Sequence, residues 1–416
     1  MKHYIFLTNY YLPRPGATGV CIHQLAKEIK KHGNDCTVIC YQDEHNEKII
    51  DGVKIERIDI PFYLNTTKKH GYIRRWINRV LTILHKSMHI LKYPLKSNKL
   101  VKNYLKLLKV VIQRNVESVL IASYTPLEGL IAAKKLKDIY PNIKIVFYST
   151  DSLSNERGSD GFLSPKLREY FGLRWEYKLF PFFDKILIME NHKDHYHSDL
   201  FKNFISKMEI VNFPLIIKPS SKSSVSKNVY SASDVINIVY AGTLYRVLRN
   251  PQYTCNLFTQ VLPYLKLQVI FIGGGDCDDI LEKAESTSEG RIKGLGFKPY
   301  SIAISYIEKA DVLLSIGNAD SPMAPSKIYE YMSTGKPIIH IYTYELDPCL
   351  GPLKRYTNAL IIKNNDQAAV NRVIDFLKNL KKIEFEEIEQ IFISSTPMYS
   401  TRLIEQIGRA SCRERV

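Results

Sequence analysis

Short apolar runs rich in isoleucine, leucine and valine alternate with helical patterns along most of the chain. In the first half these runs predict strands at residues 4–8, 36–40, 53–58, 119–122, 143–148, 185–189 and 209–211, with helices at 20–31, 127–139, 166–180 and 193–200. The second half repeats the order, with strands at 236–241, 268–272, 312–315, 337–340 and 360–362 and helices at 252–262, 301–309, 327–334 and 368–380. Strands that alternate with helices predict parallel βα units.

A polar, serine-rich segment separates the two halves. Residues 214–234 include the run KPSSKSSVSKNVYSASD, which has the composition of a linker. A chain of 416 residues is also too long for one typical core. We therefore expect an α/β protein with two doubly wound, Rossmann-like parallel-sheet domains, at 1–213 and 235–395, facing a central cleft that binds a ligand. A truncated helix is expected at 396–407, and residues 408–416 are interpreted as a non-native tail.

Composition narrows the class of protein. The hydrophobic share of 45% is that of a globular protein, and no apolar stretch is long enough to span a bilayer. The apolar run at the N-terminus is too short for a signal peptide. The 7 cysteines show neither metal-ligand spacing nor a disulfide framework, so we expect a reducing cytoplasm. The net charge of +16 favours an anionic partner.

Residues 326–339, SKIYEYMSTGKPII, combine a helix start, a carboxylate and a strand. Ser326 is expected to cap a helix that begins at Lys327 and ends at Gly335. A helix start presents free N–H groups that suit a diphosphate, and Glu330 follows on the same face, where a ribose could be held. The segment predicts a nucleotide clamp. The alternative is an ordinary helix with a surface glutamate.

The run PSKIYEYMSTGKPII resembles the donor-binding segment of the retaining family-four glycosyltransferases of the GT-B fold, and more narrowly the branch that builds bacterial surface polysaccharides. The resemblance implies that Glu330 holds the nucleotide ribose and that the helix start at Ser326 and Lys327 faces the diphosphate. The family motif usually has a second glutamate where this chain has Pro322. This departure argues against a paired carboxylate on the transferred sugar.

The loop after the strand at 236–241 carries Gly242, Thr243, Arg246 and Arg249. Sugar transfer leaves new negative charge on the nucleotide diphosphate, and a fixed cation there lowers the barrier. By resemblance, Arg249 is the second of two family cations, and Thr243 stands where the first is usual. Arg246 is the candidate substitute, and the alternative for it is a solvated surface arginine.

Further donor contacts are expected by resemblance. Gly274 lies in a glycine turn like the one that lets a nucleotide approach, and residues 293–297 resemble the loop that packs on the base. Asn318 follows the strand at 312–315 and either contacts the donor or is a turn residue. The run 276–278, DCD, is interpreted as a helix N-cap. We expect no metal and no cofactor besides the UDP- or GDP-sugar substrate.

In the first half, Gly16 and Gly19 lie in the first βα loop, and Asp151 follows the strand at 143–148. The resemblance implies that this loop borders the acceptor and that Asp151 lies near the reacting centre, where it would orient the acceptor. The alternatives are a plain strand–helix connection for the loop and a turn cap for Asp151.

A histidine run, His192, His195 and His197, opens the helix predicted at 193–200. No neighbouring cysteine or glutamate completes a set of metal ligands. We therefore expect a solvated helix start.

Residues 60–116 contain no aspartate or glutamate, while lysine and arginine recur, and they predict a basic helical insertion. Its amphipathic helices span 72–91 and 99–112. The first has Arg75, Arg79 and Lys86 opposite its apolar face and Trp76 at the edge. Such helices dock on anionic bilayers. The alternative is that the apolar faces pack on the first domain.

Together these features predict a metal-independent, retaining glycosyltransferase of the hexosyltransferase type. It would transfer a sugar from a nucleotide sugar to a glycan or lipid-linked acceptor in capsule or exopolysaccharide synthesis. It would act in the cytoplasm, peripheral to the inner face of the cell membrane, without a nucleic acid partner. A nucleotide-sugar 2-epimerase of the same fold and a basic nucleic-acid-binding protein stay open as alternatives.

Overall fold

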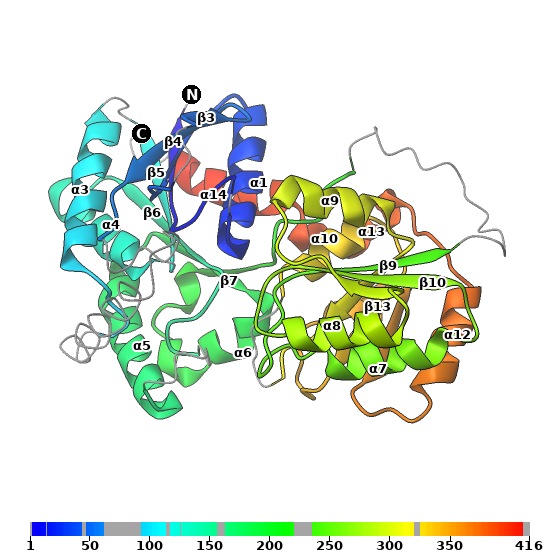
Figure 1. Cartoon of the computed structure of the whole chain (residues 1–416). Helices are drawn as coiled ribbons and strands as arrows, with labels where there is room; N and C mark the ends of the chain where they lie inside the picture. The colour runs from blue at the N-terminus through cyan, green and yellow to red at the C-terminus, as the bar shows by residue number, and fades with distance from the viewer. Residues whose placement is uncertain are drawn as a thin grey trace. The chain divides into compact units, whose positions relative to one another are not determined.

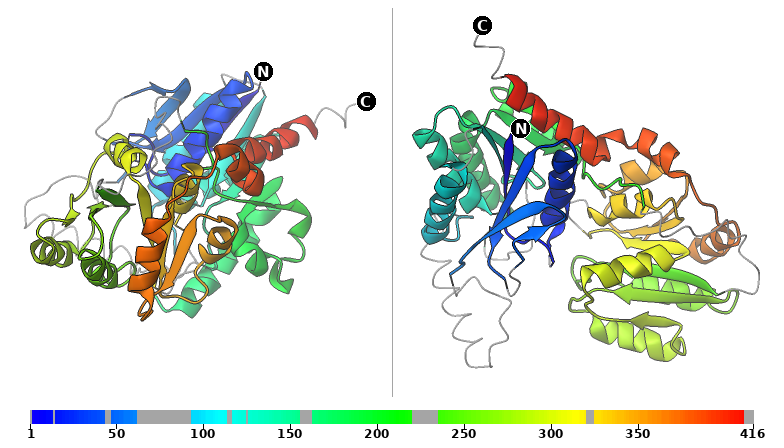
Figure 2. Two further views of the ribbon diagram at one scale, coloured as in Figure 1. Left: turned by 90° about the vertical axis from the view of Figure 1, so that its right-hand side faces the viewer. Right: turned by 90° about the horizontal axis from the view of Figure 1, so that it is seen from above.

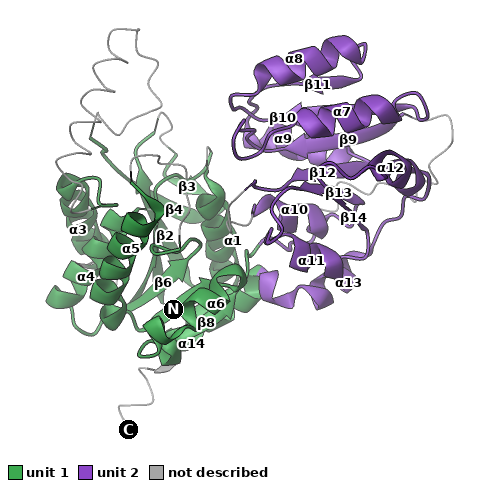
Figure 3. Ribbon diagram, turned by 90° about the horizontal axis from the view of Figure 1, so that it is seen from below, with its two compact units in different colours: residues 1–214, 397–416 green, residues 215–396 purple. Residues whose placement is uncertain are grey.

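The computed structural model describes residues 2–13, 15–43, 47–61, 93–113, 117–124, 126–155, 163–219, 235–319 and 325–410. The chain divides into two compact units, residues 1–214 with 397–416 (unit 1) and residues 215–396 (unit 2), which are coloured separately in Figure 3. Most of the predicted linker, 214–234, lies outside the described residues. Each unit is an α/β layer structure with its own sheet and its own core.

Unit 1 contains an eight-stranded sheet in the order β3-β4-β2-β1-β5-β6-β7-β8. Its strands are β1 (His3–Leu7), β2 (Asp35–Tyr41), β3 (Ile49–Ile50), β4 (Val53–Ile58), β5 (Ser118–Ser123), β6 (Lys144–Ser149), β7 (Lys185–Met189) and β8 (Met208–Val211). Among the described strands of this sheet, β3 alone pairs antiparallel, with β4. The parallel strands are apolar runs because helices cover both faces of the sheet.

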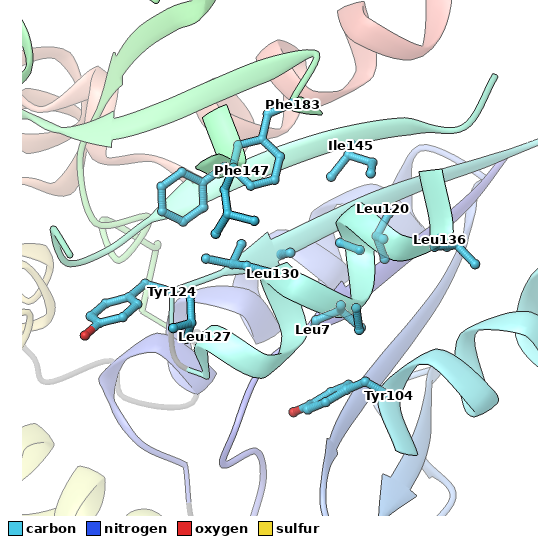
Figure 4. Close-up of a cluster of buried hydrophobic side chains, with 14 of the residues drawn as sticks. Leu7, Tyr104, Leu120, Tyr124, Leu127, Leu130, Leu136, Ile145, Phe147 and Phe183 are labelled. Atoms are coloured by element: carbon cyan, nitrogen blue, oxygen red, sulfur yellow. The ribbon is translucent and has the colours of Figure 1, made fainter. Parts of the chain in front are cut away.

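The helices of unit 1 lie in two layers (Figures 1 and 2). On one face α1 (Ala17–Lys31) contacts α14 (Pro397–Ala410). On the other face α3 (Asn98–Gln113) contacts α4 (Leu127–Ile139), and α5 (Pro165–Leu179) follows. Apolar side chains of α3, α4 and the sheet form one buried cluster, which Figure 4 shows around Leu7, Leu120 and Phe147.

The second basic helix predicted, 99–112, is α3, and its apolar face is part of this core. Leu100, Tyr104 and Leu108 are buried, whereas Lys102 and Lys106 are exposed. Burying such side chains is worth about 1.5–3 kcal/mol each, so this face is not available to a bilayer. The plain-packing alternative therefore holds for this helix. The first helix predicted, 72–91, with Arg75, Arg79, Lys86 and Trp76, lies outside the described residues.

Unit 2 contains a fully parallel six-stranded sheet in the order β11-β10-β9-β12-β13-β14. Its strands are β9 (Ile236–Ala241), β10 (Leu267–Ile272), β11 (Ile292–Gly294), β12 (Val312–Ile316), β13 (Ile338–Tyr342) and β14 (Ala359–Lys363). Strand order reverses at β9, which pairs with β10 on one side and with β12 on the other. In doubly wound sheets ligands bind at this switch point, outside the carboxyl ends of the strands.

Helices cover both faces of this sheet as well (Figure 1). One layer holds α7 (Gln252–Val261), α8 (Asp278–Thr287) and α12 (Ala369–Lys378), and the other holds α9 (Tyr300–Lys309), α10 (Lys327–Ser333) and α13 (Phe385–Ile391). A further helix, α11 (Leu350–Arg355), precedes β14.

Most of the elements expected from the sequence are present. All of the predicted strands occur, while β3, β11, α11 and α13 were not predicted. The helix predicted at 193–200 was too long, since α6 (Lys193–Tyr196) is one turn followed by a 3-10 turn at Asp199–Phe201. Helix α14 continues to Ala410, beyond the predicted end at 407. None of the helices in the described part of the chain has the length and apolar character needed to cross a membrane.

Candidate functional site

The loops that follow β9 and β12 meet at the switch point of unit 2. Arg249 Nε donates to Asn318 Oδ1 at 2.6 Å, and the Ala319 N–H donates to the carbonyl of Leu248 at 2.8 Å. Asn318 is 2% exposed, whereas Arg249 is half-buried. Because Asn318 follows β12, the strand next to β9, this bond fixes the guanidinium near the carboxyl ends of the two strands.

Thr243 and Tyr240 complete the surroundings of Arg249. A further Arg249 nitrogen lies 3.5 Å from the carbonyl of Thr243, which also accepts from the Tyr240 hydroxyl at 3.2 Å. Burial raises the pKa of Tyr240, and the guanidinium beside it opposes this effect. Thr243 thus contributes its backbone carbonyl. Gly242 lies close to the Tyr240 side chain, since a Cβ on Gly242 would be 3.0 Å from the Tyr240 hydroxyl oxygen.

Arg246, the candidate substitute cation, is exposed and turned toward α8. Its guanidinium pairs with Asp279, and its backbone N–H donates to Asp276 Oδ1 at 2.7 Å. The structure therefore ties Arg246 to a neighbouring helix and does not bring it to Arg249. The expected N-cap at 276–278 was wrong in detail, because Cys277 occupies the cap position of α8 without a side-chain cap bond.

The three glycines of the turn after β10 differ in how much space surrounds them. Gly273 and Gly275 have φ of +153° and +147°, and a Cβ on them would lie 1.8 and 1.7 Å from the carbonyl oxygens of Gly242 and Leu244. These two glycines let the β10 loop pack against the β9 loop. At Gly274 a Cβ would meet only Phe297, at 4.0 Å. Gly274 is thus the position of the turn where an added Cβ would meet no close neighbour.

Helix α10 begins where the sequence predicts, but without the predicted cap. Ser326 has helical dihedral angles and makes no side-chain cap bond. The Ile328 and Tyr329 N–H groups already donate to the carbonyls of Pro325 and Ser326, at 3.1 Å each. The helix start therefore offers an anion fewer free N–H groups than an open α-helical end would.

The clamp glutamate is paired with its neighbour on α10. Lys327 Nζ lies 2.7 Å from Glu330 Oε2 and 5.2 Å from the centre of the Tyr300 ring. The two side chains are 27% and 13% exposed, so both reach the surface from one helical face. This pair places a cation and a carboxylate side by side at the carboxyl edge of the sheet.

Sequence reasoning missed the residue that positions α10. The Tyr331 hydroxyl donates to the carbonyl of Ala241 at 3.4 Å and accepts from the Ala241 N–H at 2.8 Å. These bonds fix the helix to the end of β9, beside the Arg249 loop. Tyr331 follows Glu330 directly in the sequence, yet no local pattern indicates its partner 90 residues away.

In unit 1, the candidate acceptor residues lie around the ends of β1 and β6. Gly16 precedes α1, and a Cβ there would meet nothing within 4 Å. Gly19 lies inside the first turn of α1, where a Cβ would be 2.3 Å from the carbonyl of Tyr10. Thr18 and Thr150, both buried, are hydrogen-bonded at 3.1 Å. This contact brings the first βα loop next to the segment that carries Asp151, whose carbonyl accepts from Ser149 Oγ at 2.8 Å.

A buried carboxylate, which sequence reasoning also missed, holds the segment after Asp151. Glu176 on α5 is 0% exposed and accepts from the backbone N–H groups of Leu153 and Ser154 and from the hydroxyls of Ser152, Ser154 and Tyr196. Burial raises its pKa to about 7 although these donors oppose the rise. The carboxyl fixes the loop at the carboxyl end of β6.

The expectation of a solvated histidine run was wrong for His192 and His195. His192 is 2% exposed, and His195 Nε2 lies 2.7 Å from Ser154 Oγ at the edge of the Glu176 network. Burial lowers the pKa of each ring to about 4. These histidines are therefore neutral structural groups, whereas His197 is exposed.

The architecture matches solved glycosyltransferases. A sucrose-phosphate synthase from Thermosynechococcus elongatus aligns with a TM-score of 0.57 at 11% identity, over 99% of this chain and 98% of that one. HepE of Anabaena, in complex with UDP-glucose, gives 0.56 at 11% identity over 100% and 99%. The catalytic domain of starch synthase IV from Arabidopsis thaliana, bound to ADP and acarbose, gives 0.58 at 11% identity over 99% of each chain. The chain has the GT-B fold.

No family model matches the sequence, and no curated protein sequence matches it either. At identities this low, the likeness to other GT-B chains establishes the fold alone. Function must be argued from the residues of the site.

Proposed function

We propose that this protein is a retaining glycosyltransferase of the family-four type that uses a UDP- or GDP-sugar as donor. The observation that carries the proposal is the Arg249–Asn318 bond at the switch point of unit 2, at the same sheet edge as the Lys327–Glu330 pair. A fixed guanidinium suits a diphosphate, and a carboxylate suits the hydroxyls of a ribose. Solved proteins of the same fold bind UDP-glucose and ADP, which agrees with this assignment.

In the proposed donor site, Arg249 binds the diphosphate. Its five N–H donors are only partly engaged by the described residues, so some can turn to phosphate oxygens. Ser326 and Lys327 approach the same phosphates, and Glu330 holds the ribose. Asn318, Gly242 and Thr243 position Arg249, and Gly274 admits the nucleotide beside the 293–297 loop, where Phe297 is 68% exposed and can stack on the base.

Transfer breaks the bond between the anomeric carbon and the diphosphate oxygen and forms a bond to the acceptor hydroxyl on the same face of the sugar. The acceptor proton passes to the departing phosphate, whose new charge Arg249 stabilises. This route needs no metal and no strong enzymatic base. Asp151, near Gly16 and Gly19, orients the acceptor.

The proposed acceptor is a glycan or a lipid-linked oligosaccharide in surface polysaccharide synthesis, reached from the cytoplasmic side of the cell membrane. The acid-free segment 60–116 supports this, because a basic surface with Arg75, Arg79, Lys86 and Trp76 would attract anionic lipids. Flotation with vesicles that contain anionic lipid tests the membrane part. It should succeed with the wild-type chain and weaken when the three cations are neutralised, and equal flotation of both would refute it.

Donor binding is tested by calorimetry with UDP, GDP and their sugars. We expect Arg249→Met and Glu330→Ala each to weaken binding by about 10–100-fold, the usual loss for a charge-assisted hydrogen bond. Glu282→Ala, an exposed glutamate on α8, is the matched control and should bind as the wild type does. Failure of every nucleotide to bind the wild-type chain would refute the donor site.

The products separate transfer from the alternatives. With a bound UDP-sugar and an acceptor, NMR of the product should show the anomeric configuration of the donor. An epimer of the sugar formed without acceptor would refute transfer in favour of a 2-epimerase. Tight binding of duplex DNA at physiological salt without nucleotide-sugar binding would favour a nucleic-acid-binding protein.

A further inference from the structure

A buried group of three potential metal ligands lies at the carboxyl end of β13 in unit 2. Its members are His340 on β13 and Asp347 and Cys349 in the turn that follows. All three are buried, and one ligand atom of each lies within 4.8 Å of the others. The proposed sugar transfer assigns no task to any of them.

Two polar atoms of this group face each other without a hydrogen bond. His340 Nε2 and Asp347 Oδ2 are 3.4 Å apart. Neither atom has a hydrogen-bond partner among the described residues, and the two side chains are fully buried. Buried polar atoms are normally satisfied. A cation or a proton shared by the two atoms would satisfy both.

Neighbouring groups hold the imidazole and the carboxylate of this group in place. Ser315 Oγ lies 3.0 Å from His340 Nδ1, so the ring keeps Nε2 turned toward Asp347. The backbone N–H of Cys349 donates to Asp347 Oδ1 at 2.8 Å, which leaves Oδ2 for another partner. Outer hydrogen bonds of this kind orient the ligands of protein metal sites.

Gly317, directly after β12, provides the space for the carboxylate. A Cβ at this position would lie 1.9 Å from Asp347 Oδ2 and 3.5 Å from His340 Cε1. Any other residue would push the carboxylate away from the imidazole. The arrangement therefore depends on a residue that is not itself a ligand.

We propose that His340, Asp347 and Cys349 bind one Zn²⁺ ion, with water as the fourth ligand. Imidazole nitrogen, thiolate sulfur and carboxylate oxygen are the ligands that zinc takes in proteins. Tetrahedral zinc with bonds of about 2.0–2.1 Å separates a nitrogen and an oxygen ligand by about 3.3 Å, close to the 3.4 Å observed here. The zinc–sulfur bond replaces the sulfur–hydrogen bond, and the proton leaves to solvent. The ion would join β13 to its following turn, independently of whether sugar transfer occurs.

The test is metal content and the spectrum of the cobalt-substituted protein. The full chain is produced in minimal medium with added zinc or cobalt and washed with a chelator. The wild-type chain should retain stoichiometric zinc by elemental analysis, and its cobalt form should show thiolate-to-cobalt charge transfer and the visible bands of tetrahedral Co²⁺. No retained metal in the wild-type chain would overturn the proposal and leave a proton-bridged His340–Asp347 pair.

Variants locate the metal. Cys349→Ser should lose the charge-transfer band, and Gly317→Ala should lose the metal although every ligand is kept. Cys255→Ser on α7 alters another buried cysteine of unit 2 and should retain both metal and band. Unchanged metal and spectrum in Cys349→Ser and Gly317→Ala would overturn the proposal. The wild-type measurement needs no variant, so misfolding of one does not prevent a decision.

Discussion

The loop after β6 in unit 1 and the loop after β9 in unit 2 each follow the carboxyl end of a parallel strand. They differ in how the charged side chain beside each loop is bonded. In unit 1, Glu176 is fully buried and takes five hydrogen-bond donors from the protein itself. In unit 2, Arg249 is half-buried and donates to Asn318, while Arg246 is exposed and pairs with Asp279. The charge in unit 1 therefore stabilises a loop, whereas the charge in unit 2 is the one that the proposed function assigns to the donor. A perturbed carboxyl is thus not by itself a sign of catalysis.

The largest effect should come from removing the carboxyl of unit 1. Glu176→Leu leaves several buried donors without an acceptor, so we expect the free energy of unfolding to fall by about 3–5 kcal/mol. The chain has 2 tryptophans, Trp76 and Trp175, and both belong to unit 1, so tryptophan fluorescence in urea reports its unfolding. Glu169→Leu, at an exposed position of the same helix, should change little. Equal effects of the two variants would contradict a structural role for Glu176.

Glu176 also shows where sequence reasoning stops. Its position in the run RWEYKL resembles any polar site on an amphipathic helix, and its partners lie 20 to 24 residues away in loops and on α6. Strands such as β7 and β9 were predicted to the residue because their apolar runs record burial on both faces. The same reasoning placed Arg249 and Asn318 in the loops that follow two strands. It could not show their bond, which depends on strand order.

The next effect is a pH dependence that Glu176 imposes on stability. Its pKa is raised from 4.5 to about 7 in the folded state, so the native chain binds more protons than the unfolded chain between these values. Its contribution is full below pH 4.5 and is lost as the pH rises to 7, by about 3 kcal/mol in all.

His192 and His195 act in the opposite sense. Their pKa values fall from 6.5 to about 4, so they favour folding as the pH rises through this range. The Glu176 effect is therefore read from the difference in unfolding free energy between the wild type and Glu176→Gln. We expect this difference to decrease from pH 4.5 to 7 and then stay level. A difference that does not change with pH would show that Glu176 keeps an ordinary pKa.

A smaller loss of stability is expected when a methyl group added on α5 displaces the same loop. In Gly172→Ala the new Cβ would lie 2.1 Å from the carbonyl of Leu153, and we expect a loss of about 1–3 kcal/mol from overpacking. The matched control is Gly129→Ala on α4, where the Cβ would make an ordinary contact of 3.5 Å with Leu7. That variant should be neutral or gain up to about 1 kcal/mol. Urea unfolding followed by tryptophan fluorescence compares the two, and a loss of the same size in both would show that any methyl group on these helices is costly.

The smallest effect is expected at Arg246, which is exposed in the loop after β9 of unit 2. Its pairing with Asp279 is open to solvent on both sides, so Arg246→Gln should leave the unfolding midpoint unchanged. If Arg246 reaches the donor at all, it must first leave Asp279. UDP binding should then weaken by less than about fivefold in Arg246→Gln, since exposed charges contribute little, and should strengthen in Asp279→Asn, which frees the guanidinium. Calorimetry with UDP on both variants, and on Arg249→Met for comparison, measures whether Arg246 contributes to donor affinity. Unchanged affinity in Arg246→Gln and in Asp279→Asn would make Arg246 a surface residue and leave Arg249 as the guanidinium of this loop that serves the donor.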